Sequence, residues 1–509
     1  MSYFLPLYEV NGVVIFNPLS TRHKPRMPNS MLAVAASIHG SHEYVMVDGN
    51  LEQNPLSVLS NYFATGKYRY FAVTVMPGPA LKQAIPFSES IKKQFPKVTI
   101  IWGGYFPSNH PAVCLRSGYV DYIVNGPGDK VFPQLLNALN NNLPLDGLSN
   151  LIRLGTDHQL IKHKTDELYD QDTLPPLPYT YLATFYPLTR YLPKTYLGRR
   201  TLSYHSSMGC PFTCSFCAVV PIYKARWKGQ SAQRIYEAVL PLLQAYQADA
   251  LEFHDNNFFV SEKRTAEFAR LIQPHHINWW GEARIDTMDK YSDVTLALLR
   301  DSGCKMIFFG AESGNDSVLK EMDKGGTQTA KQILSFAARL KKFNIVPEYS
   351  FVLGTPAPTE QAVWQNIQHD IAFIREVKKV NPETEIIIYT YSPVPTEGSE
   401  MFKLVQSSGF KYPEKLAEWI SPSWEKFDLR KNPLTPWLKP SMIDTIKNFE
   451  TVLNGFYPTV SDLRMSATQK ALIKKISTVR YRFSIYTLPY EIKALQKLWR
   501  YRQPEIEGF

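Results

Sequence analysis

Short apolar runs alternate with helix-like segments in two separate stretches of this chain. In the first stretch, five runs have the continuous apolar character of buried parallel strands: residues 13–16, 44–47, 70–75, 98–102 and 119–124. Parallel strands need crossover connections, which are usually helices, so residues 1–150 are predicted to form a doubly wound α/β domain. The alternation resumes over residues 200–405. Because 509 residues exceed the usual size of a single core, we expect two domains and an appendage.

The segments outside these stretches have weaker patterns. Residues 151–199 are rich in proline and lack periodicity, which predicts a linker that wraps between domains. Residues 406–509 are predicted to be mainly helical, and their aromatic residues either belong to a core or close the mouth of the second domain over an apolar substrate. These aromatic residues are Trp419, Trp424, Phe427, Trp437, Phe449, Phe456 and Tyr457.

The formal charge of +10 is concentrated near the C-terminus. Between Arg464 and Arg502, ten Lys or Arg residues stand against one acid, Glu491. Interleaved apolar residues fit two helices with a solvated basic face, or contact with an anionic membrane or substrate. No signal peptide is apparent, and no apolar run is long enough to cross a bilayer. We therefore expect a cytoplasmic protein, with peripheral membrane contact through the basic segment left open.

Unusual loop residues follow the predicted strands of the first stretch. They are Asp48, Met76, Pro77, Gly103, Gly104 and Gly126. In doubly wound folds ligands bind beyond the carboxyl ends of the strands, and glycine lets the backbone approach a bulky, flat ligand. The pattern alone fits a nucleotide, a flavin or no ligand.

Three of the five cysteines lie within eight residues, as Cys210, Cys214 and Cys217. This spacing is no disulfide framework and suits a reducing compartment. Three thiolates can hold three corners of a [4Fe–4S] cluster and leave one iron free for a small molecule. A zinc knuckle or three buried thiols are the alternatives, but zinc needs a fourth ligand, and His205 and Cys304 lack zinc-finger spacing.

The C-x3-C-x2-C run, with Phe216 before its last cysteine, resembles the cluster motif of the radical S-adenosylmethionine (SAM) enzymes. The resemblance implies that residues 200–405 form a partial (β/α)6 barrel in which the free iron binds SAM. It also places further residues of this chain beside SAM, in the order of the family's motifs: Asp255, Arg284, Glu312, Ser313 and Gly354. Arg284 could instead simply pair with Glu282 or Asp286, while Cys304 is expected to fill core space.

The first stretch resembles the cobalamin-binding domain that precedes many radical SAM enzymes. The resemblance implies that the six loop residues named above contact cobalamin, and that the loop containing Met76 and Pro77 lies beneath the corrin. The Asp-x-His-x-x-Gly motif of other cobalamin domains is missing, so the cobalt is not expected to bind a histidine of this chain. A vestigial domain that only packs is the alternative.

Together these resemblances imply a cobalamin-dependent radical SAM enzyme that methylates an unactivated carbon through a 5′-deoxyadenosyl radical and methylcobalamin. Oxidative cyclisation, as in the anaerobic magnesium-protoporphyrin monomethyl ester cyclase, and ring rearrangement stay open. A non-catalytic cobalamin-binding protein would be expected to have lost the cysteines, and a methylthiotransferase needs three further N-terminal cysteines where this chain has Cys114 alone. The expected partners are a small-molecule or lipid-like substrate and an electron donor such as flavodoxin or ferredoxin, with no nucleic acid.

Overall fold

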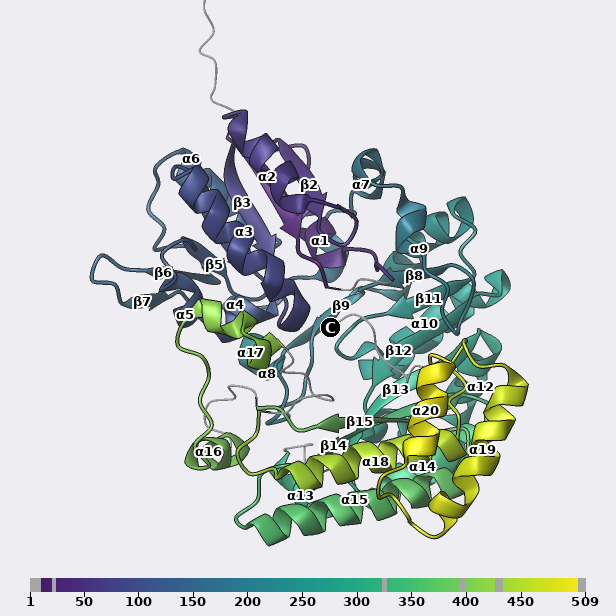
Figure 1. Ribbon diagram of the computed structural model, residues 1–509. Helices are drawn as coiled ribbons and strands as arrows, with labels where there is room; N and C mark the ends of the chain where they lie inside the picture. The colour runs from purple at the N-terminus through teal and green to yellow at the C-terminus, as the bar shows by residue number, and fades with distance from the viewer. Residues whose placement is uncertain (1–10, 21–23, 323–326, 394–399, 426–433, 502–509) are drawn as a thin grey trace, which may run out of the picture. The chain divides into compact units, whose positions relative to one another are not determined.

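The computed structural model describes residues 11–20, 24–322, 327–393, 400–425 and 434–501, and its chain divides into two compact units (Figure 1). The first, here called the N-terminal unit, contains Met1–Tyr191 together with Pro413–Lys426. The second, here called the barrel unit, contains Leu192–Tyr412 and Phe427–Glu507. Phe427 and Arg502, named above, lie outside the described residues.

The N-terminal unit is built on a seven-stranded sheet in the order β2-β1-β3-β4-β5-β6-β7. Its first five strands are parallel, as the apolar runs predicted, and the doubly wound α/β class is confirmed. Their bounds are β1 Gly12–Asn17, β2 Tyr44–Asp48, β3 Tyr68–Thr74, β4 Thr99–Gly103 and β5 Tyr122–Val124. In the segment predicted to be a linker, β6 (Leu151–Leu154) and β7 (Leu160–Lys162) extend the sheet in antiparallel register. Both strands are short and partly exposed, so the sequence contains no long apolar run that would predict them.

Helices connect the parallel strands of the N-terminal unit. The helix α2 shows the local signals for a helix start, because the Asn54 side chain accepts from Ser57 N and Pro55 occupies the first turn. The helices are α1 Asn29–Ile38, α2 Pro55–Ala64, α3 Leu81–Gln94, α4 Tyr105–Asn109, α5 Pro111–Leu115, α6 Val131–Asn140 and α7 Tyr179–Phe185. Three 3-10 turns complete this part: η1 Gly78–Ala80, η2 Gln171–Thr173 and η3 Leu188–Tyr191.

A segment from the C-terminal region belongs to the N-terminal unit. It contains η6 (Leu416–Ile420) and α17 (Pro422–Glu425), where residues 406–509 were expected to form one region. The Trp419 ring lies 4.9 Å from the ring of Phe106 and 4.6 Å from that of His110, centroid to centroid. Packing of aromatic rings stabilises such a contact. The ring of Trp419 therefore holds the segment against the residues that follow β4.

The barrel unit contains a six-stranded parallel sheet in sequence order, β8-β11-β12-β13-β14-β15, as the partial (β/α)6 barrel requires. The strands are β8 Thr201–Tyr204, β11 Ala250–Phe253, β12 Asn278–Ala283, β13 Cys304–Glu312, β14 Val346–Leu353 and β15 Glu385–Thr390. All six lie within residues 200–405, where the sequence predicted a second alternation of strands and helices. Cys304 is 1% exposed, so it fills core space as expected.

Helices follow the strands, and most begin with a Ser, Thr or Asn cap whose side chain accepts a backbone N–H. They cover one face of the sheet, where Phe253 of β11 packs on Phe268 and Phe309 of β13 packs on Phe336. The bounds are α8 Val220–Tyr223, α9 Ala232–Ala245, α10 Glu262–Ile272, α11 Ile285–Met288, α12 Asp293–Asp301, α13 Asp316–Glu321, α14 Ala330–Lys342, α15 Glu360–Val380 and α16 Glu400–Ser407, with η4 Phe258–Val260 and η5 Gln273–His275.

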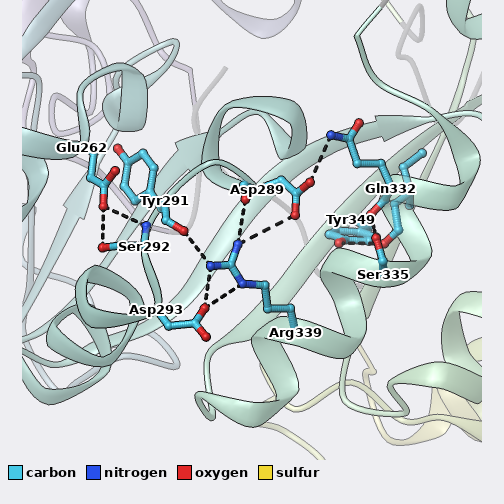
Figure 2. A network of polar contacts seen from close by, with 10 residues as sticks. Glu262, Asp289, Tyr291, Ser292, Asp293, Gln332, Ser335, Arg339 and Tyr349 are labelled. Carbon is cyan, nitrogen blue, oxygen red and sulfur yellow. Dashed lines mark hydrogen bonds and ion pairs between the residues drawn. The ribbon is translucent and has the colours of Figure 1, made fainter.

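A polar network ties α14 to the connection before α12 (Figure 2). Arg339 donates to the carbonyl oxygens of Asp289 and Tyr291 at 2.7 and 2.6 Å and to the Asp293 carboxylate at 2.6 Å. The Gln332 amide donates to Asp289 at 3.1 Å. These bonds satisfy loop carbonyls that no helix or strand pairs, so they hold α14 against the connection before α12.

Three helices, α18 (Pro440–Phe456), α19 (Ala467–Arg482) and α20 (Tyr490–Leu498), pack on one another in the barrel unit (Figure 1). Phe449 is fully buried among them, which is a core position and not a lid. Several apolar side chains of α19, α20 and their connection are instead exposed, led by Phe483 at 73% and Leu498 at 72%. Among the described residues, the search for a helix with the length and hydropathy of a membrane span found none.

Candidate active site

The cysteine loop, residues 210–226, connects the two strands of a small antiparallel hairpin. It leaves β9 (Ser207–Gly209) and returns as β10 (Trp227–Gly229), which pair in register. Gly209 has φ +77°, and a Cβ there would stand 2.2 Å from the carbonyl oxygen of Arg226. No side chain fits this position, so the glycine before Cys210 allows the two ends of the loop to close.

The three sequence-predicted thiols share this loop but differ in exposure. Cys214 is buried, whereas Cys210 and Cys217 are partly exposed, as is Phe216. Burial raises the pKa of the Cys210 thiol, so iron binding would have to displace its proton. In the described part of the chain, no three His, Cys, Asp or Glu side chains converge on one metal position. In a [4Fe–4S] cluster each thiolate binds a different iron, so convergence on one point is not required.

Arg284, immediately after β12, reaches the middle cysteine. Its Nη1 donates to Cys214 Sγ at 3.0 Å, while Nε and Nη2 donate to the two Asp286 oxygens at 2.9 and 2.8 Å. The guanidinium carbon lies 3.9 Å from the centroid of the Phe212 ring. Of the two acids considered as partners from the sequence, Asp286 is bonded. The bidentate pair fixes the plane of the guanidinium beside the sulfur.

Asp255, after β11, supports the start of the cysteine loop. Its carboxylate is fully buried and accepts from Ser206 N at 3.0 Å, from Ser206 Oγ at 2.9 Å and from Ser207 Oγ. Arg264 donates to the Ser206 carbonyl oxygen and lies against the Phe258 ring. Contact between Asp255 and SAM stays a prediction. In the structure the Asp255 carboxylate holds the residues that lead to Cys210.

The strand end at Glu312 is distorted. Glu312 has φ +67°, and the register between β13 and β14 shifts between Gly310 and Glu312. A non-glycine residue in the left-handed region is uncommon, and such strain concentrates at functional sites. The Gln328 amide holds the distortion by donating to the carbonyl oxygens of Gly310 and Ala311 at 3.0 and 3.1 Å. The backbone before Glu312 is thus fixed, and this limits the directions that the Glu312 side chain can take.

Asp370 of α15 fixes the two residues after Glu312. One of its oxygens accepts from Ser313 Oγ at 2.7 Å and from Gly314 N at 2.8 Å. Burial raises the pKa of Asp370 to about 6, although the two hydrogen bonds lower it. Gly354, after β14, has φ +76°, and its carbonyl oxygen accepts from Trp437 Nε1 at 2.9 Å. Trp437 therefore approaches a predicted SAM position from the C-terminal aromatic region.

The predicted cobalamin residues lie at the carboxyl ends of the N-terminal sheet but in different surroundings. Asp48 is fully buried, with its carboxylate bonded to Asn17, Asn50 and Tyr191. Met76 is partly exposed and Pro77 exposed. Gly103, Gly104 and Gly126 are partly exposed, and Ser108 Oγ accepts from Gly126 N at 3.1 Å. Asp48 therefore braces the end of β1 and the turn after β2, whereas the other residues present backbone at the carboxyl ends of the strands.

Sequence reasoning missed the residues that support the predicted ones. Asp370, Gln328 and Arg264 hold Ser313, Gly310 and Ser206, but each lies far along the chain from the residue it holds. For Arg264 and Asp370 the available signal was a polar residue on an apolar helix face, which does not reveal the partner. Gln328 lies in the connection before α14, where the sequence offers no such signal.

Residues 204–369 match the model of the radical SAM superfamily. An uncharacterized methyltransferase of Pyrococcus horikoshii is 24% identical over 67% of this chain and 72% of its own length. The anaerobic magnesium-protoporphyrin IX monomethyl ester cyclase of Synechocystis is 25% identical over 52% of this chain, and that match spans about half of the cyclase, 53%.

Two solved structures share the fold over almost the whole chain. The radical SAM methyltransferase TsrM of Kitasatospora setae, bound to tryptophan and a SAM analog, has a TM-score of 0.66 at 15% identity and covers 96% of this chain and 98% of its own. The cobalamin-dependent radical enzyme OxsB, bound to aqua-cobalamin and SAM, has a TM-score of 0.63 at 14% identity over 97% of this chain and 75% of its own. Residues 204–369 are therefore similar to a radical SAM domain, and the chain has the fold of TsrM and OxsB.

Proposed function

We propose that this enzyme is a cobalamin-dependent radical SAM methyltransferase that methylates an unactivated carbon. The observation that carries the proposal is the cysteine loop, closed by β9 and β10 and contacted by Arg284, in a radical SAM domain that follows a doubly wound sheet. When bound, the cluster and SAM supply one-electron chemistry, and cobalamin supplies methyl transfer.

The residues around the loop fit a cluster with one open iron. Cys210, Cys214 and Cys217 would hold it, and Asp255 and Arg284 position the loop. Glu312 and Ser313 would receive SAM, because a carboxylate and a hydroxyl can accept from and donate to its amino acid or ribose groups. Phe216 and Gly354 complete the predicted SAM contacts. Each of these residues lies in the cysteine loop, at the last position of a strand or within two residues after one, and buried bonds limit the movement of several of them.

The sheet edge of the N-terminal unit fits a flat ligand. With the order β2-β1-β3-β4-β5, the strand order reverses between β1 and β3, where ligands of such sheets bind. The loop with Met76 and Pro77 follows β3. Next to it Gly104 has φ +104°, and a Cβ there would stand 2.7 Å from the Val75 carbonyl oxygen. Bare backbone at this edge suits the corrin of cobalamin, with Gly103 and Gly126 as its further contacts.

The test is anaerobic reconstitution with iron, sulfide and hydroxocobalamin, followed by reduction in the presence of SAM. Mass spectrometry then measures 5′-deoxyadenosine and S-adenosylhomocysteine. Both products, in protein whose visible spectrum shows bound corrin, support the methyltransferase. Loss of both products in fully loaded protein would contradict it.

An oxidative cyclase or ring rearrangement enzyme is the second candidate. The cyclase relative from Synechocystis favours it, because its match spans half of this chain. The same experiment separates the two functions, since cyclisation without methyl transfer yields 5′-deoxyadenosine and no S-adenosylhomocysteine.

We further propose a cytoplasmic enzyme that receives electrons from a flavodoxin or ferredoxin and takes a small-molecule or lipid-like substrate. The basic segment and the exposed Phe483 and Leu498 support contact with an anionic membrane. Flotation with vesicles containing phosphatidylserine tests the contact. The double variant Lys475→Glu, Lys497→Glu should lose it, whereas equal binding to neutral vesicles would contradict it.

A further inference from the structure

Three glutamates lie on the face of the barrel sheet that the helices leave uncovered. Along each strand, side chains alternate between the two faces. Phe253 of β11 and Phe309 of β13 pack beneath the helices. Glu252, one residue before Phe253, therefore faces the other side, and so do Glu282 of β12 and Glu348 of β14. Their exposed fractions are 8, 7 and 5%.

Strand register brings these carboxyls together. Glu252 pairs across the sheet with Trp280, and Phe308 pairs with both Glu282 and Glu348. Trp280 Nε1 donates to Glu348 at 3.2 Å. Towards the start of the strands the same face is apolar, with Leu197, Ala250, Trp280 and Met306 packed as one cluster. The acids thus form a layer above an apolar base.

Glu282 stands out in this layer because the described residues offer it no hydrogen-bond partner. Burial raises its pKa well above the usual range, and the negative charges of Asp255 and Glu348 raise it further. His205, at the end of β8, also has a buried Nε2 without a partner among the described residues. His254 Nε2 lies 3.3 Å from the Glu252 carboxylate.

Neighbouring cations are engaged elsewhere. Arg264 donates to the carbonyl oxygens of Gln230 and Phe258, and Arg284 makes a bidentate pair with Asp286. A buried carboxyl without a partner costs free energy. A ligand that brings a positive charge and N–H donors would remove that cost and would balance the charge of the layer.

We infer that Glu282, supported by Glu252 and Glu348, anchors a primary ammonium group of the substrate. The inference rests on the proposed function and adds a substrate class, a compound with an amino group. As the ammonium binds, the Glu282 carboxyl releases its proton to solvent and becomes the counter-ion. The apolar base beneath keeps water away, which strengthens the pair.

The probe is methylammonium, with methanol and tetramethylammonium as matched ligands. Methanol lacks the charge, and tetramethylammonium lacks N–H donors. Binding to the folded protein raises its unfolding temperature, and we expect about 2 to 4 °C with saturating methylammonium on the reconstituted protein. Glu282→Gln keeps the shape and should remove the rise. The surface substitution Glu267→Gln on α10 should keep it. Three results would each overturn the inference. They are an equal rise in wild type and both variants, an equal rise in wild type with methylammonium, methanol and tetramethylammonium, and no rise in wild type with methylammonium.

SAM also carries an ammonium group, so the ammonium that Glu282 binds could belong to the substrate or to SAM. The affinity of the protein for SAM decides between the two. Equilibrium dialysis measures SAM binding to wild type and to Glu282→Gln. A tenfold or greater loss of SAM affinity in the variant would assign Glu282 to SAM and overturn the substrate role. Equal affinities support it. Failure of the proposed methyltransferase would instead show as missing S-adenosylhomocysteine in wild type, which these two measurements do not involve.

Discussion

Arg284 Nη1 donates a hydrogen bond of 3.0 Å to Cys214 Sγ, across 70 residues of chain. The same guanidinium is held by Asp286 and covers the Phe212 ring. A donor to a cysteine sulfur stabilises the thiolate, and bonds of this kind tune the reduction potential of iron–sulfur clusters. We therefore propose that Arg284 is a positioning residue for the cluster, in addition to the SAM contact predicted from the sequence.

Arg284→Lys should weaken SAM cleavage by about 10- to 100-fold. Lysine keeps the charge but cannot bond two Asp286 oxygens and the sulfur at once. The measurements are 5′-deoxyadenosine formation and the cluster reduction potential. Arg300→Lys, at an exposed pair with Asp301, is the matched control and should change neither. An unchanged potential in Arg284→Lys would contradict the positioning role.

Cys214→Ala should abolish cluster assembly and SAM cleavage while cobalamin binding persists, because the residues predicted to contact the corrin lie in the other unit. Iron and sulfide content, 5′-deoxyadenosine and the corrin spectrum measure the three effects. Cys304→Ala is the control for removal of a buried thiol. It should cost about 1 to 2 kcal/mol of stability and keep the cluster. Deoxyadenosine production by Cys214→Ala would refute the cluster assignment.

Gly104→Ala should destabilise the N-terminal unit far more than Gly78→Ala. Both glycines have positive φ, but a Cβ at Gly78 meets nothing within 4 Å, whereas one at Gly104 meets the Val75 backbone at 2.7 Å. Gly104 also has ψ −174°, a region open essentially to glycine. We expect about 1 to 2 kcal/mol for Gly78→Ala and about 3 to 5 kcal/mol for Gly104→Ala. Urea unfolding measures both. Equal costs would show that the Gly104 backbone relaxes.

Asp370 should make the barrel unit less stable as pH rises. Burial raises its pKa from 3.8 in the unfolded chain to about 6 in the folded one. Between these values the folded state binds more protons. The contribution is therefore fully present below about pH 4 and lost as pH passes about 6. Asp370→Asn should remove this slope, on the order of 3 kcal/mol. Urea unfolding of wild type and variant at pH 4 to 7 measures it, and parallel curves would contradict it.

The parallel strands of the two sheets were predictable because they are largely buried on both faces. Such strands are continuous apolar runs, visible without any knowledge of their neighbours. β6 and β7 were missed because they are short and partly exposed, with β7 at the edge of the sheet, and the proline-rich composition around them favours a linker. Residues 413–426 were missed for a different reason. Trp419 has aromatic partners at Phe106 and His110, about 300 residues earlier, and local pattern cannot reveal such contacts.

The sequence by itself determined the two α/β domains, the cysteine loop and the strand ends that carry the predicted SAM and cobalamin residues. These are properties of local spacing and of apolar runs. Only the tertiary structure decided that Arg284 bonds Cys214, that Asp370 holds Ser313 and that Glu282 lies buried with no hydrogen-bond partner among the described residues. Burial and strand register bring distant residues together, and the cost of leaving a buried polar group unpaired depends on that assembly, not on the order of residues along the chain.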